Sequence, residues 1–355
     1  RLANLMQPEV RDRALWDLYS ELEMPLVPVI VDMQRAGVKL DVDFLAEMGQ
    51  ELGQRLGELG EEIEGHVGHP LNIISTQQLS VALFDEMDLA EPWMRRGKSG
   101  HYSTAADVLE KLQDRHPVIA LILEHRQLSK LKGTYVDALP ALVNPRTGRV
   151  HTSFNQTGSV TGRFSSSNPN LQNIPIRTDL GRKVRRAFIA DEGWLLLAVD
   201  YSQVELRVLA HISGDPAMLA AFARGEDIHA STAAAIYGVP LQEVTRDQRR
   251  VAKMTIFAIS YGVTGYGLSD RTELTPPEAD AFIKTYFETY PRIKEYIDGT
   301  RDQAREQGYV ETLLGRRRYF PELGTEARVH RNVRDAAYRM AINAPIQGTA
   351  ADILK

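Results

Sequence analysis

The sequence predicts an α+β fold (α/β in the broad sense) in which helices dominate and more than one subdomain is present. The length of 355 residues exceeds what one small hydrophobic core organises. An amphipathic stripe predicts a long helix over about 43–66. A continuous apolar run at 194–199 is typical of a strand buried on both faces of a sheet, and the pattern is almost wholly helical from about 204 to 355.

The composition is that of an ordinary soluble globular protein, with 43% apolar and 25% charged residues. No run of about 18 apolar residues is present, which excludes a membrane-spanning helix, and the first residues lack the pattern of a signal peptide. The chain begins with Arg rather than Met, which suggests a fragment. The absence of cysteine excludes disulfides and thiolate sites and favours a cytosolic location. The net charge of −5 does not indicate nucleic-acid binding, so only local basic clusters could do so.

The first half contains helices separated by recognisable stops and caps. Residues 24–36 end at Gly37, a helix stop that precedes the short strand-like segment 38–40. Ser75 and Gln78 predict a capping box for a helix through Phe84. Further helices are predicted from 103 or 104 to 115 and from 117 to about 135, and a turn at 144–148 lies between two extended segments.

A basic, glycine-rich loop covers 92–102. Its Gly97-Lys98-Ser99 is similar to the end of a phosphate-binding loop, but the glycine required five residues upstream is replaced by Pro92. The spacing therefore excludes a P-loop, and the segment is interpreted as a local basic cluster.

Asp200 directly follows the predicted buried strand. A carboxylate at the carboxyl end of such a strand is held at the edge of a sheet, where ligands usually bind. An Asp in this place can equally be the N-cap that starts the next helix. Its position alone does not choose between these two interpretations, and the residues that follow, 201–207, bear on the choice.

Four side chains recur at four-residue spacing on a predicted helix: Arg249, Lys253, Phe257 and Tyr261. Each step turns about 40° beyond a full turn, so the four share one stripe. Two cations followed by two aromatic rings suit a triphosphate at one end and a stacked base at the other. A solvated face with two half-buried rings is the alternative. His229 could donate to a phosphate, although a lone histidine on a helix is more often simply packed.

The segment 151–177 is too polar for a core. Within it, Thr161–Pro175 is rich in amides and hydroxyls and contains Arg163. Such groups bind sugars, phosphates and minor-groove acceptors without reading base sequence. An ordinary polar loop is the alternative.

Together these segments resemble the motifs of family A DNA polymerases, in the family's order and over nearly the whole chain. Residues 200–211 resemble motif A. Arg249-x3-Lys253-x3-Phe257-x3-Tyr261-Gly262 resembles motif B, which lies on the helix that closes over the incoming nucleotide. The family's primer–template segment is similar to 161–175, and two further family segments are similar to 315–319 and 343–352.

The resemblance implies a right-hand polymerase architecture with a palm β-sheet, a helical thumb and helical fingers. By this analogy residues 1–22 are the remnant of the exit from an exonuclease domain, 23–40 and 136–205 form an incomplete palm, 41–135 form the thumb, and 206–355 form the fingers. The basic loop at 95–98 would lie near the thumb tip.

The implied activity is template-directed DNA synthesis, in which deoxynucleotides are added to a primer 3′-hydroxyl by two-metal phosphoryl transfer. The implied cofactors are two Mg²⁺ ions, with Mn²⁺ as a substitute. The implied partners are primer–template DNA and deoxynucleoside triphosphates. The resemblance further implies a bacterial, monomeric, cytoplasmic and nucleoid-associated protein that acts in DNA replication and repair, with no membrane partner.

The resemblance also assigns roles residue by residue. Asp200 would be the catalytic carboxylate and bind both metal ions, assisted by the backbone carbonyl of Tyr201. The nucleotide would be bound by Gln203, Glu205, His229, Arg249, Lys253, Phe257 and Tyr261, of which Glu205 would reject a 2′-hydroxyl. Primer–template contacts are expected from Lys130, Tyr135, Arg163, Gln172, Asn173, Arg318, Asn343 and Gln347.

Single-subunit RNA polymerases are the alternative family, since they share the right-hand architecture and have segments similar to motifs A and B. They must admit a 2′-hydroxyl, so Glu205, which would reject this group, favours a DNA polymerase. The chain departs from the family at Ile256 and Ala258, where Asn and Gly are common, and these changes leave the nucleotide-facing stripe intact. A DNA-binding scaffold without chemistry is the other alternative. Retention of the metal and phosphate ligands argues against a degenerate scaffold.

Motif C of the family is a His-Asp-Glu whose Asp is the second metal carboxylate, and none of the nine histidines here is followed by Asp. A single carboxylate binds two divalent ions poorly. We therefore expect that residues 1–355 alone do not polymerise and that a complementing C-terminal piece restores activity.

Overall fold

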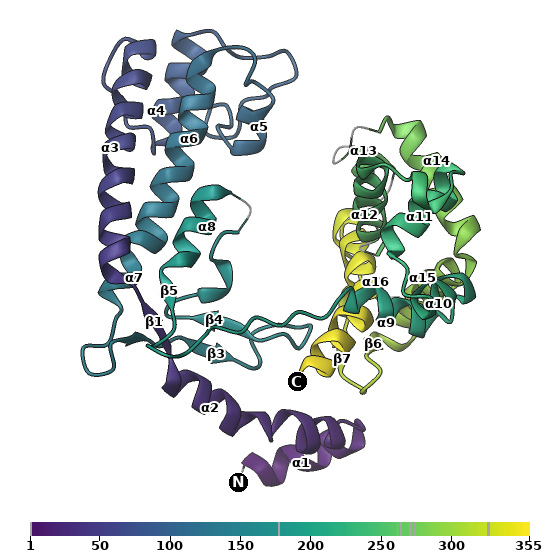
Figure 1. Ribbon diagram of the computed structural model, residues 1–355. Helices are drawn as coiled ribbons and strands as arrows, with labels where there is room; N and C mark the ends of the chain where they lie inside the picture. Colours follow the sequence, from purple (N-terminus) through teal and green to yellow (C-terminus); the bar gives the residue numbers. More distant parts are fainter. Residues whose placement is uncertain are drawn as a thin grey trace. The chain divides into compact units, whose positions relative to one another are not determined.

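In the computed structural model, residues 2–176, 178–260, 262, 265–269, 272, 274–324 and 327–355 are described. The chain divides into two compact units (Figure 1). The first unit contains Arg1–Val31, Asn155–Ser165 and Ala198–Lys355, and the second contains Asp32–Phe154 and Ser166–Leu197. Helices dominate the described residues and small sheets of two or three strands accompany them, which confirms the predicted mixed fold class. No helix within these ranges is both long and apolar enough to cross a lipid bilayer.

The second unit is built on two long helices, α3 (Val42–Val67) and α6 (Pro117–Leu131), which lie side by side (Figure 1). The Asp41 carboxylate caps α3 by accepting a hydrogen bond from the Phe44 N–H at 2.9 Å, and Gly68 ends it in the left-handed conformation. The predicted helix over about 43–66 is confirmed. Its apolar stripe is the buried face, with Leu45, Met48, Leu52, Leu59 and Ile63.

A three-stranded antiparallel sheet in the second unit has the order β2-β1-β5. β1 (Val38–Leu40) pairs with β2 (Arg149–Val150) on one side and with β5 (Phe188–Ile189) on the other. α2 (Leu26–Ala36) stops before β1 at Gly37, whose φ is +59° and where a Cβ would lie 2.7 Å from the Val150 carbonyl oxygen. Only glycine fits there, so both the predicted stop and the short strand are confirmed.

The shorter helices of the second unit correct two predictions. Ser75 Oγ accepts from the Gln78 N–H at 3.4 Å, but the Gln78 side chain accepts from the Asn72 N–H at 3.0 Å, so the capping box is half formed. The helix predicted from 103 or 104 to 115 spans only Ala106–Glu110. Arg126 donates to the Thr104 carbonyl before its start, and 111–115 form turns whose N–H groups bond three residues back, such as Leu112 to Leu109 at 2.9 Å. The others are α4 (Thr76–Ser80), the π-helices η2 (Val81–Glu86) and η3 (Lys132–Val136), α7 (Ala138–Ala141), the 3-10 helix η4 (Leu171–Asn173) and α8 (Asp179–Arg186).

The first unit is helical around one large core. Leu206, Ile256, Tyr286 and Ile342 meet in this core and come from four different helices. Its helices are α1 (Leu2–Asp12), η1 (Leu18–Glu23), α9 (Val204–Ser213), α10 (Pro216–Ala223), α11 (Ile228–Tyr237), η5 (Leu241–Glu243), α12 (Arg246–Ser260), α13 (Gly265–Ser269), α14 (Pro276–Thr289), α15 (Pro291–Gln307), η6 (Pro321–Leu323) and α16 (Arg331–Leu354).

The family-like segment 315–319 lies in a β-hairpin of the first unit. β6 (Tyr309–Glu311) and β7 (Arg317–Tyr319) form this antiparallel hairpin with Tyr309 opposite Tyr319. Gly315 lies in its turn with φ +82°. A further two-stranded sheet joins β3 (Ser153–Asn155) and β4 (Ser165–Ser167).

The strand predicted at 194–199 is wrong. These residues have no regular structure, and Leu195 and Leu197 are 92% and 87% exposed. An apolar run becomes a buried strand only when a neighbouring strand bonds its backbone and another layer covers its side chains. None of the described strands pairs with this run, which explains the failure.

Candidate functional site

The predicted stripe lies on α12, in the first unit. Arg249 is half-buried, Lys253 is exposed and Phe257 is half-buried, so three of its four members lie along one accessible helix face. Tyr261 lies outside the described residues. The opposite side of the helix packs inward, with Val251, Thr255 and Ala258 buried.

α12 starts at a reciprocal cap that fixes its first turn. The Thr245 N–H donates to Gln248 Oε1 at 2.9 Å, and the Gln248 N–H donates to Thr245 Oγ1 at 3.2 Å. Ile256 and Ala258, the two departures from the family pattern, are both buried. They therefore leave the exposed side chains of the stripe unchanged.

Asp227 joins α11 to α12. One carboxylate oxygen caps α11 by accepting from the His229 and Ala230 N–H groups at 3.0 and 3.1 Å. The other oxygen accepts from Arg249 Nε at 2.9 Å and Nη2 at 2.6 Å. Burial raises the pKa of Asp227, but these bonds outweigh it and the pKa is lowered overall. Sequence reasoning missed Asp227, although an Asp before a helix signals an N-cap.

His229 is buried beside the stripe. Its ring centroid lies 6.1 Å from that of Phe257, and within the described part of the chain its Nδ1 is buried with no hydrogen-bond partner. Burial lowers the pKa of His229; Asp227 partly opposes this, and Arg249 and Lys253 add to it. The imidazole is therefore neutral at neutral pH. A buried polar atom without a partner costs free energy, so this nitrogen is a candidate donor or acceptor for a ligand or a water.

Glu205 and Arg163 are brought together from distant parts of the sequence. Arg163 Nη2 donates to Glu205 Oε1 in an ion pair between the loop at 161–164 and the first turn of α9. One member was predicted to bind the primer–template and the other to sense the nucleotide sugar. This contact joins one described member of each predicted set directly.

Asp200 and Tyr201 are exposed and precede α9. The alternative that Asp200 is the N-cap is wrong, because Gln203 occupies the cap position of α9, with φ +55° and ψ +35°. No group of three or more Asp, Glu, His or Cys side chains that could hold a metal ion occurs among the described residues. The Asp200 carboxylate is therefore exposed to solvent, but it does not form a metal site together with two or more other Asp, Glu or His side chains among the described residues.

The sequence pattern of DNA polymerase family A matches residues 42–355. The chain belongs to this family. Among its relatives are "DNA polymerase I, thermostable" of Thermus aquaticus, 50% identical over 98% of this chain and 41% of the relative, and "DNA polymerase I" of Chloroflexus aurantiacus, 50% identical over 100% of this chain and 38% of the relative. "DNA polymerase I" of Bacillus subtilis is 48% identical over 98% of this chain and 39% of its own length. The chain thus spans about two fifths of these relatives.

A solved family A structure has the same fold. The POL domain of Pol1 from M. smegmatis, in complex with DNA primer-template and dNTP, superposes with a TM-score of 0.90 and 40% sequence identity. The match covers 99% of this chain and 61% of that one. The prediction of a family A polymerase domain with this architecture is confirmed.

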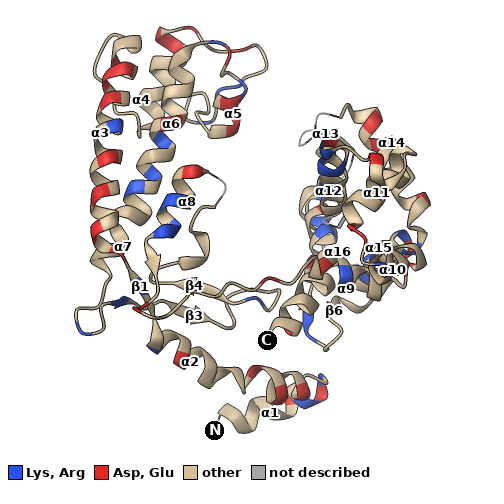
Figure 2. Ribbon diagram, in the orientation of Figure 1, with Lys and Arg blue, Asp and Glu red and all other residues tan. Residues whose placement is uncertain are grey.

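Several DNA-contact candidates of the family A chain lie in the second unit. The Tyr135 hydroxyl donates to the Asn173 carbonyl, so this buried ring anchors the exposed η4 segment that also contains Gln172. Lys130 is exposed at the end of α6. Figure 2 shows a further basic helix, α8, which sequence reasoning missed although its run is dense in cations: Arg182, Lys183, Arg185 and Arg186.

The remaining DNA-contact candidates lie on β7 and α16 of the first unit. Arg318 Nη2 lies 2.9 Å from Met340 Sδ, and the guanidinium is 5.1 Å from the centroid of the Phe320 ring. Burial lowers the pKa of Arg318. Asn343 is buried and Gln347 is half-buried in α16, so both lie deeper than Arg163.

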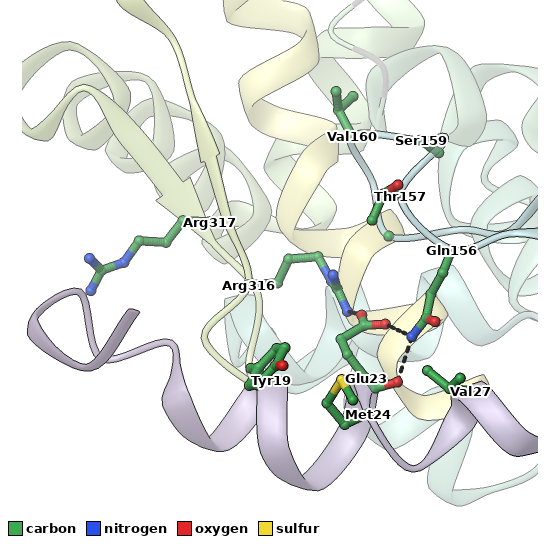
Figure 3. A pocket seen from close by; sticks show the side chains of 11 residues that line it. Tyr19, Glu23, Met24, Val27, Gln156, Thr157, Ser159, Val160, Arg316 and Arg317 are labelled. Carbon is green, nitrogen blue, oxygen red and sulfur yellow. Dashed lines mark hydrogen bonds and ion pairs between the residues drawn. The ribbon is translucent and has the colours of Figure 1, made fainter. Parts of the chain in front are cut away.

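A buried charge cluster, formed by Glu23, Arg316, Asp352 and Lys355, was missed entirely. Arg316 Nε donates to Asp352 Oδ1 at 2.8 Å and Nη2 donates to Glu23 Oε1, while Lys355 Nζ lies 2.6 Å from the same Glu23 oxygen. Two of its members, Glu23 and Arg316, line an open pocket of about 460 Å³, where Gln156 also donates to Glu23 (Figure 3). The arginine run at 316–318 was its only sequence signal.

The neutral state of His229 predicts a pH-dependent stability. A buried histidine with a lowered pKa binds fewer protons in the folded state than in the unfolded state. The folded state is therefore not destabilised by this group above pH 6.5, its ordinary pKa, and loses stability as the pH falls below that value. We expect the thermal midpoint of unfolding to be lower at about pH 5 than at about pH 7.5, and we expect this decrease to be smaller in His229→Gln. Scanning calorimetry at both pH values measures this.

His69→Gln is the matched control. Glu86 raises the pKa of this exposed histidine, so its contribution has the opposite sign and is lost as the pH rises. In His69→Gln, the decrease in the thermal midpoint from about pH 7.5 to about pH 5 should be equal to that of the wild type or larger. An equal acid loss in His229→Gln and in the wild type would contradict the prediction.

Proposed function

We propose that this family A chain provides the nucleotide-binding and primer-binding part of a template-directed DNA polymerase, which adds deoxynucleotides to a primer 3′-hydroxyl by two-metal phosphoryl transfer. The observation that carries the proposal is the accessible face of α12, where Arg249 and Lys253 precede Phe257, and the buried His229 of α11 lies beside Phe257. The names of the relatives, and the primer-template and dNTP in the solved structure of one of them, support it.

The proposed nucleotide lies along this face. Arg249, already oriented by Asp227, and Lys253 would donate charge-assisted hydrogen bonds to the phosphates. The unpartnered nitrogen of neutral His229 would add one donor, with Gln203 nearby. Phe257 and Tyr261 would pack against the sugar and base. Of these groups, Arg249, Lys253, Phe257 and His229 lie on helices and Gln203 caps α9 before the nucleotide arrives, which limits the entropy lost on binding.

The Asp200 carboxylate and the Tyr201 backbone carbonyl would hold the metal ions. Both are hard oxygen donors, the kind that Mg²⁺ prefers and Mn²⁺ accepts, so they fit the proposed pair of ions in kind. When bound, such ions lower the pKa of the primer hydroxyl and stabilise the leaving pyrophosphate. One carboxylate is too little charge for two divalent ions, and Glu205 is assigned to the sugar, so the proposal requires a second metal carboxylate besides Asp200.

We propose primer–template contacts for the eight residues predicted from the sequence. In the second unit the candidates are Lys130, Tyr135, Gln172 and Asn173; in the first they are Arg163, Arg318, Asn343 and Gln347. We assign 23–40 and 136–205 to the palm, 41–135 to the thumb, 206–355 to the fingers and 1–22 to the exit from an exonuclease domain. We further propose a monomer that acts on bacterial chromosomal DNA in the cytoplasm.

Primer extension tests the proposed function. The protein of the relatives' full length is expected to extend a primer on a template with Mg²⁺ and deoxynucleoside triphosphates. Residues 1–355 alone are expected to bind the primer–template and not to extend it, and a complementing C-terminal piece should restore extension. Binding without extension by the full-length protein would support a non-catalytic scaffold instead.

Glu205 is expected to exclude ribonucleotides. Its half-buried carboxylate, held by Arg163, would occupy the space that a 2′-hydroxyl needs. We expect Glu205→Ala to raise the ratio of ribonucleotide to deoxynucleotide incorporation about 10- to 100-fold, since crowding a fitted site costs about 1–3 kcal/mol. The ratio of kcat/KM values for the two nucleotides measures it.

Glu205→Gln is the matched control because it keeps the volume and removes the charge. If exclusion is steric, this variant should still reject ribonucleotides. A full loss of selectivity in Glu205→Gln would show that charge, rather than bulk, excludes the 2′-hydroxyl. An unchanged ratio in Glu205→Ala would remove Glu205 from the sugar site.

A further inference from the structure

The Arg316 guanidinium lies directly against the backbone of Gly162. Gly162 is buried and has a φ of +77°, and a Cβ at this position would lie 2.5 Å from Arg316 Nε and 2.8 Å from its Cζ. A side chain at residue 162 would therefore be strained by the backbone conformation and would displace the guanidinium. The loop that carries Arg163 packs on Arg316 through this glycine.

The buried charge cluster contacts the chain on both sides of Arg163. Arg316 packs against Gly162, and Lys355 Nζ lies 5.1 Å from the ring centroid of Phe164. The Gly162 N–H also donates to the Ser159 carbonyl at 3.2 Å. Contacts with the cluster on both sides of Arg163 thus hold its backbone, while its guanidinium pairs with Glu205.

Two carboxylates hold the Arg316 guanidinium, and a hydroxyl in turn holds one of these carboxylates. Asp352, whose side chain is fully buried, accepts from Arg316 Nε at 2.8 Å and from Thr312 Oγ1 at 2.7 Å. Glu23 accepts from Arg316 Nη2 and pairs with Lys355 at 2.6 Å. The two cations balance the two anions, and a planar guanidinium held at two edges keeps one orientation.

We propose that Arg316 is a positioning residue for primer–template binding, which holds the loop at 161–164 in the conformation that presents Arg163. Arg316 does not contact the DNA in this proposal: it lies beneath Gly162, and its side chain is 17% exposed. The inference rests on the proposed function, since it assumes that Arg163 binds the primer–template. It adds Arg316 as a residue that affects primer–template binding only by positioning Arg163.

A double-mutant cycle in the full-length protein tests the proposal. The dissociation constant for a fluorescent primer–template is measured without nucleotide for the wild type, Arg163→Ala, Arg316→Gln and the double variant. We expect each single variant to weaken binding about tenfold, as for the loss of one good DNA contact. The double variant should bind no more weakly than Arg163→Ala, because Arg316 acts through Arg163.

Two further variants guard against a failure of Arg316→Gln to fold. Gly162→Ala leaves every charge in place and should weaken binding about as much as Arg316→Gln, with its thermal midpoint measured alongside. Arg317→Gln removes the neighbouring cation of the same hairpin, which pairs with Glu311 at 3.2 Å, and should bind like the wild type.

The outcomes separate the proposals. Additive losses in the double variant, or wild-type binding by Gly162→Ala, would overturn the role of Arg316 while leaving the polymerase proposal intact. A wild-type protein that neither binds nor extends the primer–template would refute the proposed function, and this inference with it.

Discussion

Asp200→Ala is expected to reduce primer extension by roughly 10³-fold or more, or at least about 4 kcal/mol of activation free energy. The physical reason is that Asp200 would bind both metal ions, and loss of a group merely adjacent to a metal ligand already costs about 10- to 100-fold. Because Asp200 is exposed, its truncation leaves no cavity. Initial rates of extension by the full-length protein at fixed Mg²⁺ measure the loss.

Asp298→Ala is the matched control. Asp298 is a half-exposed carboxylate on α15 that pairs with Lys294 at 2.6 Å, far from α9 in sequence, and its loss should leave extension unchanged. The affinity of Asp200→Ala for primer–template should also stay near that of the wild type. Extension at the wild-type rate by Asp200→Ala would end its assignment as a metal ligand.

Lys253→Ala is expected to lower kcat/KM for the incoming nucleotide about 100-fold, or about 2.7 kcal/mol, as for the loss of one preorganised donor to a developing charge. Lys253 is exposed on α12, one turn beyond Arg249, so its side chain reaches solvent where a triphosphate would lie. Its removal breaks none of the ion pairs of Arg249, which are made with Asp227. Single-nucleotide incorporation over a range of nucleotide concentrations separates the effects on kcat and KM.

Arg250→Ala provides the comparison on the same helix. Arg250 is exposed and pairs with Asp247 at 3.5 Å, and its position on the helix lies off the stripe. It should retain the wild-type kcat/KM. Equal losses in the two variants would mean that overall positive charge, and not the stripe, attracts the nucleotide.

Apolar periodicity and helix-stop signals correctly predicted the elements that depend on contacts within a few residues of the sequence. The apolar spacing of α3 and the stop at Gly37 depend on neighbours within a few residues, so a single sequence reveals them. The stripe on α12 follows from helix geometry in the same way. The capping box at Ser75 failed in part because Gln78 had a second acceptable partner in Asn72, and spacing does not rank two partners.

Contacts between distant segments were not predictable from spacing. The bond of Asp227 to Arg249, the pair of Arg163 with Glu205 and the buried charge cluster each join residues far apart in the sequence. The apolar run at 194–199 failed for the same reason, because a buried strand requires a partner strand that the run itself does not specify.

That run also bears on how the purified chain behaves at high concentration. From Trp194 to Val199 it contains neither a charge nor a proline, and Trp194 is 76% exposed. Unpaired backbone groups flanked by apolar side chains are a template for pairing with another copy. Self-association should therefore increase with sulfate or phosphate, which favour apolar burial, and weaken on cooling. We therefore expect these six residues, more than the net charge, to govern self-association of the chain.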